Sequence, residues 1–64
     1  MTLHENARFT VYRLVSEYNP QDGNIWEIAK AIKTAFIIKA INEVEVEMLG
    51  YNLSRLTVEE IMNA

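Results

Sequence analysis

Hydrophobic residues recur along the first part of the chain at the spacing of an amphipathic helix. The apolar positions there are Leu3, Ala7, Val11, Leu14, Val15 and Tyr18. Because an α-helix turns about once every 3.6 residues, side chains three and four positions apart share one face. The pattern predicts a helix over about 3–18. Asn19-Pro20 ends it, since the residue before a proline is disfavoured in the helical region.

The longest hydrophobic run, residues 25–49, predicts a second helix without interruption. Its apolar residues form two adjoining stripes: Ile25, Ala29, Ile32, Phe36 and Ala40 in one, and Trp26, Ile37, Ile41, Val44 and Met48 in the other. Gly50 follows the run and is typical of a helix end. The turn-rich stretch 19–24, with its Asp22-Gly23 reversal, makes the two helices antiparallel neighbours in a hairpin.

Three predicted helix starts share one capping pattern, in which Thr or Asn precedes Glu by three positions. These pairs are Thr2 with Glu5, Asn24 with Glu27, and Thr57 with Glu60. In such a capping box each side chain accepts a hydrogen bond from the other residue's backbone N–H. The last pair predicts a short C-terminal helix over about 58–63. We therefore expect an all-α fold in a single domain covering residues 1–64.

Two segments also fit a different fold. Residues 43–48 alternate between Glu and hydrophobic residues, which is the period of a β-strand. Residues 9–12 are rich in strand-forming types. If both were strands, the chain would be an α+β protein with strands near 8–15 and 43–49. The Thr2 cap and the spacing of the first hydrophobic stripe favour the all-α fold.

The length of the second helix predicts a homodimer. At full length it would extend roughly 37 Å, beyond the ~28 Å diameter of a compact chain of this size, and its uncovered apolar face indicates an interface. Either the helix breaks near Asn42 or a second chain covers it. Two antiparallel copies centred near Ile41 would set Lys39 against Glu43, as in a two-fold dimer, although these two residues also fit an i,i+4 pair within one helix. The predicted dimer interface comprises Trp26, Phe36, Ile37, Ile41, Val44 and Met48.

The amino-acid composition excludes several kinds of metal site and of covalent chemistry. The chain is acidic, with a net charge of −3, and contains no Cys and a single His. Disulfides, thiolate metal sites and histidine metal clusters are therefore excluded within one chain. Ser16 and Ser54 lack a patterned His partner, so nucleophilic catalysis has no support. We expect a non-enzymatic protein without cofactor or metal. With no secretory signal and no uncharged stretch long enough to span a membrane, a cytoplasmic location is expected.

Two kinds of function fit these observations. The first is a homodimeric protein–protein interaction or regulatory module, with Tyr51, Arg55 and Glu59 contacting a partner protein. The alternative is a dimeric DNA-binding transcriptional regulator, in which the residues that contact DNA would be Arg8, Arg13, Lys30 and Lys33. Residues 42–64 hold five Glu against one Arg. Because Lys and Arg supply most of the affinity for phosphates, this acidic end favours the interaction module.

Overall fold

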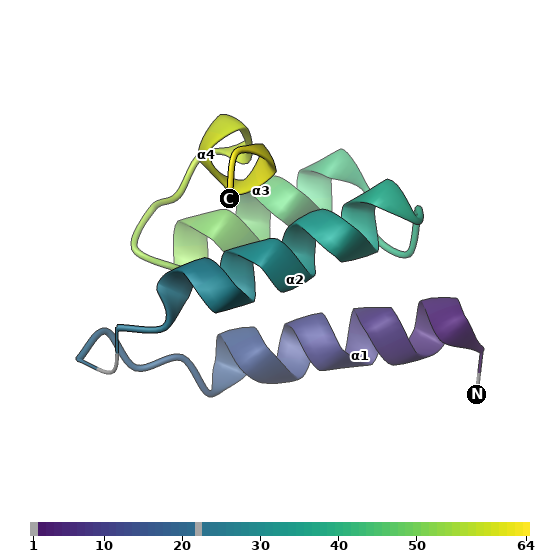
Figure 1. The fold of residues 1–64 in the computed structure, drawn as a ribbon, viewed down its shortest axis with the longest axis horizontal. Helices are drawn as coiled ribbons and strands as arrows, with labels where there is room; N and C mark the ends of the chain where they lie inside the picture. The colour runs from purple at the N-terminus through teal and green to yellow at the C-terminus, as the bar shows by residue number, and fades with distance from the viewer. Residues whose placement is uncertain (1, 22) are drawn as a thin grey trace.

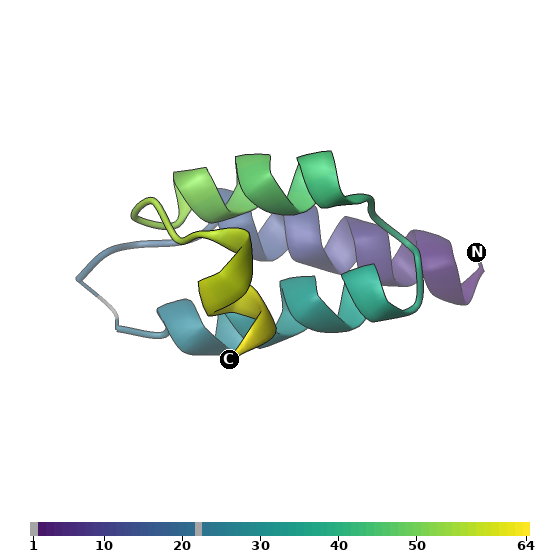
Figure 2. The same cartoon turned by 90° about the horizontal axis from the view of Figure 1, so that it is seen from above.

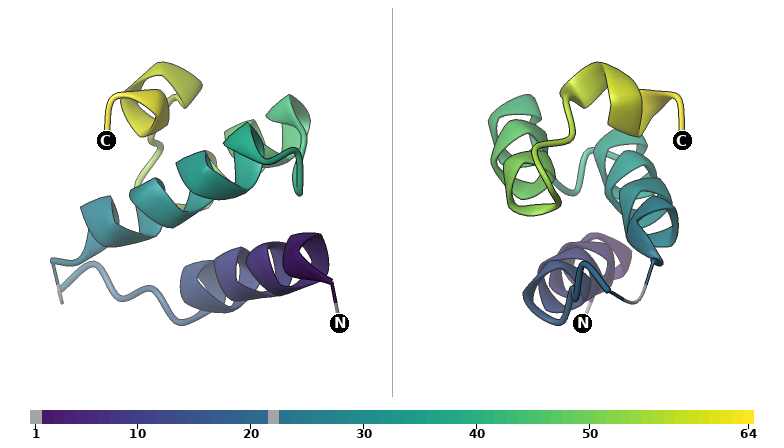
Figure 3. Two further views of the ribbon diagram at one scale, coloured as in Figure 1. Left: turned by 45° about the vertical axis from the view of Figure 1, so that its right-hand side comes forward. Right: turned by 90° about the vertical axis from the view of Figure 1, so that its left-hand side faces the viewer.

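The computed structural model describes residues 2–21 and 23–64, which form four helices and no strand. These are α1 (Leu3–Ser16), α2 (Ile25–Ile37), α3 (Glu43–Asn52) and α4 (Val58–Met62). α1 forms one layer, α2 and α3 lie side by side on it, and α4 crosses over them (Figures 1 and 3). The all-α prediction is confirmed. The strands considered near 8–15 and 43–49 are wrong, because both segments are helical.

The hydrophobic core lies between α2 and α3. These two helices run side by side (Figure 2) and contact each other and both outer helices. α1 and α4 lie on opposite sides of this pair (Figure 3). The largest fully buried side chains come from every helix and from the loop before α4. They are Ile32, Leu49, Leu53, Ile61, Val11 and Val46. One face of each helix thus contributes to a single core. The predicted stripe of α1 packs against this core from Ala7 to Tyr18, whereas Leu3 is 71% exposed.

The predicted helix over 25–49 is divided at residues 38–42. α2 ends in a Schellman motif: the Ala40 N–H donates to the Ala35 carbonyl (2.8 Å) and the Lys39 N–H to the Phe36 carbonyl (3.0 Å). Lys39 has a φ of 65°, in the left-handed region that this motif normally fills with Gly. A lysine there costs about 1 kcal/mol. Because Lys39 rather than a glycine occupies the left-handed position after α2, the local sequence does not indicate that the helix ends there.

α3 begins with a complete capping box, which was not among the predicted ones. The Glu45 N–H donates to Asn42 Oδ1 (2.8 Å), and the Asn42 N–H donates to Glu45 Oε1 (3.2 Å). An unbroken helix of roughly 37 Å would also exceed the longest dimension of the molecule, 32 Å. The break lets α3 fold back against α2. The run therefore buries part of its hydrophobic surface within one chain, including Ile32, Ile41 and Leu49.

The three predicted capping boxes form to different extents. The Thr57–Glu60 box is complete at the start of α4. At the start of α1, the Thr2 hydroxyl accepts from the Glu5 N–H (3.1 Å). Asn24 makes no side-chain capping bond at the start of α2. Sequence spacing thus located the starts of α1, α2 and α4 but not their full hydrogen bonding.

The end of α3 depends on close packing at Gly50. α3 continues through Gly50 to Asn52, so the prediction that Gly50 stops the helix is wrong. The Leu56 N–H donates to the Gly50 carbonyl (2.8 Å), which draws the following loop onto α3. Ser54 and Arg55 in this loop both have a φ of 62°. In the connection between α1 and α2, Gly23 has a φ of 73°. Asp22 of the predicted reversal lies outside the described residues.

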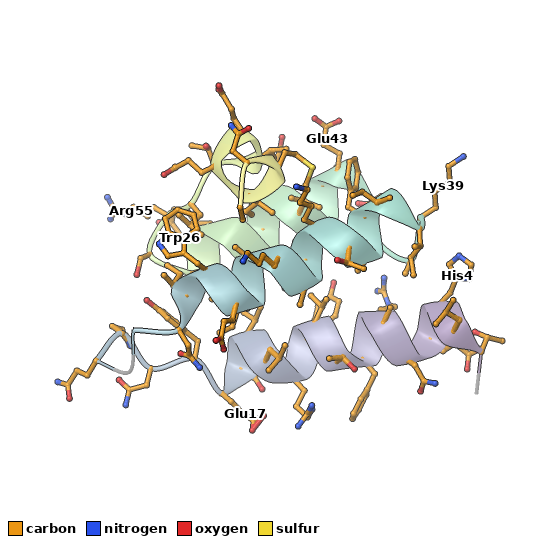
Figure 4. All side chains as sticks on the ribbon, viewed as in Figure 1. His4, Glu17, Trp26, Lys39, Glu43 and Arg55 are labelled. Atoms are coloured by element: carbon orange, nitrogen blue, oxygen red, sulfur yellow. The ribbon has the colours of Figure 1, made fainter. Side chains whose placement is uncertain are left out.

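Side-chain hydrogen bonds fasten α1 to the other helices near both of its ends. His4 Nε2 donates to the Ile38 carbonyl (2.6 Å) just after α2. In Figure 4, His4 and Lys39 lie at the same end of the bundle. At the other end, the Tyr18 hydroxyl and Ser54 Oγ are 2.9 Å apart. α1 is therefore held by polar contacts as well as by its single fully buried residue, Val11.

Candidate interaction surfaces

The outer face of α3 carries an exposed hydrophobic stripe. Val44, Met48 and Tyr51 are 71%, 48% and 63% exposed, and their spacing of four and three residues places them on one side of the helix. Val46 and Leu49 are buried on the opposite side. We call the first three residues the α3 stripe. α3 is hydrophobic on two opposite faces, and the fold covers only one of them.

This two-faced helix accounts for the alternation in residues 43–48. Residues two positions apart are separated by about 200° around a helix. Val44 and Val46 therefore point in nearly opposite directions, the first into solvent and the second into the core. The alternation that indicated a strand is produced here by a helix with two hydrophobic faces.

Charges of both signs flank the α3 stripe. Glu43 and Glu47 are exposed, and the Arg55 guanidinium lies over the Tyr51 ring, with Cζ 5.9 Å from the ring centroid. Glu47, Tyr51, Arg55 and Glu59 line a shallow groove between α3 and α4. The structure thus brings together the three residues predicted to bind a partner protein.

The outer face of α2 combines hydrophobic and basic residues. Trp26, Lys30, Lys33 and Ile37 share one side of the helix through spacings of four, three and four residues. We call them the α2 face. Trp26 is 50% exposed and Ile37 is 63% exposed, and Lys33 Nζ donates to the Ala64 carbonyl (3.4 Å). Figure 4 shows Trp26 at the end of the bundle that also carries Arg55.

The six residues predicted as one dimer interface are divided among three environments. Two belong to the α2 face and two to the α3 stripe, on separate helices. Phe36 packs partly buried against the core, and Ile41 is 4% exposed within it. An antiparallel interface centred on Ile41 requires a continuous helix through residues 38–42, where the structure has a turn. That arrangement, with Lys39 against Glu43, is therefore incompatible with the fold.

Glu45 is the centre of a polar cluster between α1 and α3. Its Oε2 accepts a hydrogen bond from the Tyr12 hydroxyl (2.6 Å) and pairs with Arg8, while Oε1 accepts from the Asn42 N–H. The Arg8 guanidinium also lies over the Tyr12 ring, with Cζ 5.1 Å from the centroid. The cluster was not predicted. The spacing of Asn42 and Glu45, which matches a capping box, was the only sequence sign of it.

The cluster shifts two pKa values in opposite directions. Burial raises the pKa of Glu45, but hydrogen bonds from Tyr12 and the Asn42 amide, together with Arg8, outweigh it and hold that pKa below its usual value. The hydrogen bond to Glu45, reinforced by burial, raises the pKa of Tyr12 above its usual value. An ionised Glu45 and a neutral Tyr12 are therefore favoured together near neutral pH. This arrangement fastens α1 to the start of α3.

The basic residues considered for DNA binding do not gather on one surface. Arg8 is paired with Glu45. Arg13 Nη1 lies 3.7 Å from the Glu17 carboxylate one turn further along α1. The two lysines are in the α2 face. A nucleic-acid surface would therefore have two lysines rather than four converging cations.

The chain matches no protein-family model, no curated protein and no solved structure. Among residues 2–21 and 23–64, no helix has the length and hydrophobicity needed to cross a membrane. Proposals for function therefore rest on the surfaces described above.

Proposed function

We propose that this protein is a small non-enzymatic interaction module that acts as a homodimer through the α3 stripe. The observation that carries the proposal is that Val44, Met48 and Tyr51 are exposed together on the outward face of α3, while its inward face already packs into the core. Contiguous exposed hydrophobic residues on a small domain mark an association surface. Glu43 and Glu47 lie beside the stripe, and Arg55 lies at its end. A second copy of the chain can therefore offer a charge of opposite sign to each of these positions.

The stability of a small domain adds support for self-association. A single core in a chain of this size supplies only a few kcal/mol, and oligomerisation is a common supplement. The described residues contain no disulfide to take that role. Covering the α3 stripe would remove hydrophobic surface from water without disturbing the core, because the stripe faces away from it.

Met48→Asp is expected to convert the protein from a dimer to a folded monomer. The substitution places a charge in the middle of the stripe, where burial against a second copy would be unfavourable. Sedimentation equilibrium over a range of micromolar concentrations would measure the mass, and circular dichroism the helix content. A matched control is Phe9→Asp, which changes an exposed hydrophobic residue on α1 and should leave the dimer intact. A monomeric wild type at these concentrations would contradict the proposal.

Nucleic-acid binding is a second candidate, favoured by the gathering of Trp26, Lys30 and Lys33 on the α2 face. In a dimer formed through α3, both α2 faces would stay accessible. We nevertheless expect no salt-sensitive complex with mixed-sequence duplex DNA, because two lysines neutralise few phosphates. A fluorescence anisotropy titration across a salt series tests this expectation. Tight binding that weakens steeply with salt, and that Lys30→Glu removes, would favour the DNA-binding function instead.

A further inference from the structure

We infer that two copies of α3 pair antiparallel across a two-fold axis, with Arg55 of each chain beside the partner's Glu43. This inference rests on the proposed homodimer and specifies its geometry. It goes beyond self-association in general, because the pairing assigns a direction to the two helices and names the charges that select it.

The α3 stripe is suited to antiparallel self-pairing. Val44 and Tyr51 stand near its two ends, about 10 Å apart along the helix axis, and Met48 lies between them. Antiparallel pairing sets Val44 opposite the partner's Tyr51, and Tyr51 opposite the partner's Val44. Met48 then lies near the axis, against the partner's Met48. Each contact occurs twice, as a two-fold interface requires.

The charges beside the stripe distinguish antiparallel from parallel pairing. Because the Arg55 guanidinium lies over the Tyr51 ring, it sits at the level of Tyr51, next to the partner's Val44 and hence to the partner's Glu43. In parallel pairing, the two-fold axis would run along the helices and set this flank of one copy on the opposite side from the same flank of its partner. Arg55 would then lie at the level of the partner's Arg55, far from either Glu43, and the contact between opposite charges would be lost.

Arg55 and Glu43 also lie on the same flank of the stripe. Glu47 lines the groove that contains Tyr51 and Arg55, and Glu43 is one helical turn before Glu47 on the same side. A two-fold axis in the plane of the interface, perpendicular to both helices, keeps this flank of one copy next to the same flank of the other. Within residues 2–21 and 23–64, Glu43 makes no ion pair, so its carboxylate is accessible to a second chain.

The backbone of the loop after α3 places Arg55 where this pairing needs it. Ser54 and Arg55 both adopt left-handed φ angles of 62°, and the Arg55 N–H donates to the Tyr51 carbonyl (3.0 Å). This conformation turns the chain back toward α3 and sets the guanidinium over the Tyr51 ring. Two successive non-glycine residues in this region are unusual, and such conformations often occur at functional sites.

A charge-exchange experiment tests the inference. The Arg55→Glu chain carries carboxylates at both positions, and the Glu43→Arg chain carries guanidinium groups at both. Each variant alone should self-associate about tenfold more weakly or worse, because both cross-chain contacts become repulsive. An equimolar mixture should recover wild-type association as a heterodimer, since both contacts are then between opposite charges. Native mass spectrometry distinguishes the heterodimer from the two homodimers by mass, and sedimentation velocity gives the affinity.

The controls separate failure of the geometry from failure of the dimer. The double variant Glu43→Arg/Arg55→Glu should self-associate like the wild type, and circular dichroism should show unchanged helix content in every variant, because both positions are exposed. If the wild type is a dimer that Met48→Asp disrupts, yet the two charge variants show no preference for each other, the antiparallel pairing is overturned and the homodimer stands. If the wild type is monomeric, the homodimer itself is overturned.

Discussion

Gly50→Ala is expected to lower the free energy of unfolding by about 2 kcal/mol, within the range measured for overpacked sites. A Cβ at this position would lie 2.5 Å from the Leu56 carbonyl oxygen and 2.7 Å from Ile61 Cδ1. The first contact is with backbone, so relief requires the loop after α3 to move. That movement would lengthen the Leu56 N–H to Gly50 carbonyl hydrogen bond and loosen the packing of α4.

The higher helix propensity of alanine opposes this steric destabilisation, so a control for helix propensity is needed. Alanine gains up to about 1 kcal/mol over glycine within a helix, so a net loss at Gly50 isolates the steric effect. Asn52→Ala, at an exposed position of the same helix, should change stability by less than about 0.5 kcal/mol. Urea unfolding followed by circular dichroism measures both variants. A Gly50→Ala protein more stable than the wild type by about 1 kcal/mol, the full propensity gain, would show that close packing there is unimportant.

Glu45→Ala is expected to lower the free energy of unfolding by about 2–3 kcal/mol near neutral pH. The change removes half of the α3 capping box, and it leaves the part-buried Tyr12 hydroxyl and the Arg8 guanidinium without their partner. Separation of α1 from α3 should follow at lower denaturant concentration than in the wild type. Glu47→Ala, on the exposed side of α3, is the matched control and should have little effect.

The pKa shifts add a pH signature to the Glu45 prediction. Because the folded pKa of Glu45 lies below its unfolded value, its stabilisation is complete above the unfolded pKa and is lost as pH falls through the folded pKa. The raised pKa of Tyr12 acts at the other end: its stabilisation is complete below its unfolded pKa and is lost as pH rises through the folded one. Unfolding measured across pH should show a shallower acid dependence in Glu45→Gln than in the wild type. Identical acid profiles would contradict the assigned shift.

Local sequence signals predicted the helix starts better than the helix ends. Thr57 and Thr2 were identified as caps because a capping side chain and its partner lie within one turn of chain. Asn42 has the same relation to Glu45 but lies inside a continuous hydrophobic run, whose pattern predicts an uninterrupted helix. The stop at Lys39 had no local signal, since a lysine in a left-handed conformation is set by the packing around it.

The sequence by itself determined the helical class, the stripe of α1 and the capped starts of α1 and α4, because these depend on residues within a few positions of one another. Only the tertiary structure decided where the run 25–49 divides and which of its hydrophobic residues stay outside. Ile41 and Val44 look equivalent in the pattern, yet one is buried and the other forms part of the α3 stripe. The physical reason is that folding α3 back against α2 covers only one face of each helix, and that choice depends on contacts between distant parts of the chain.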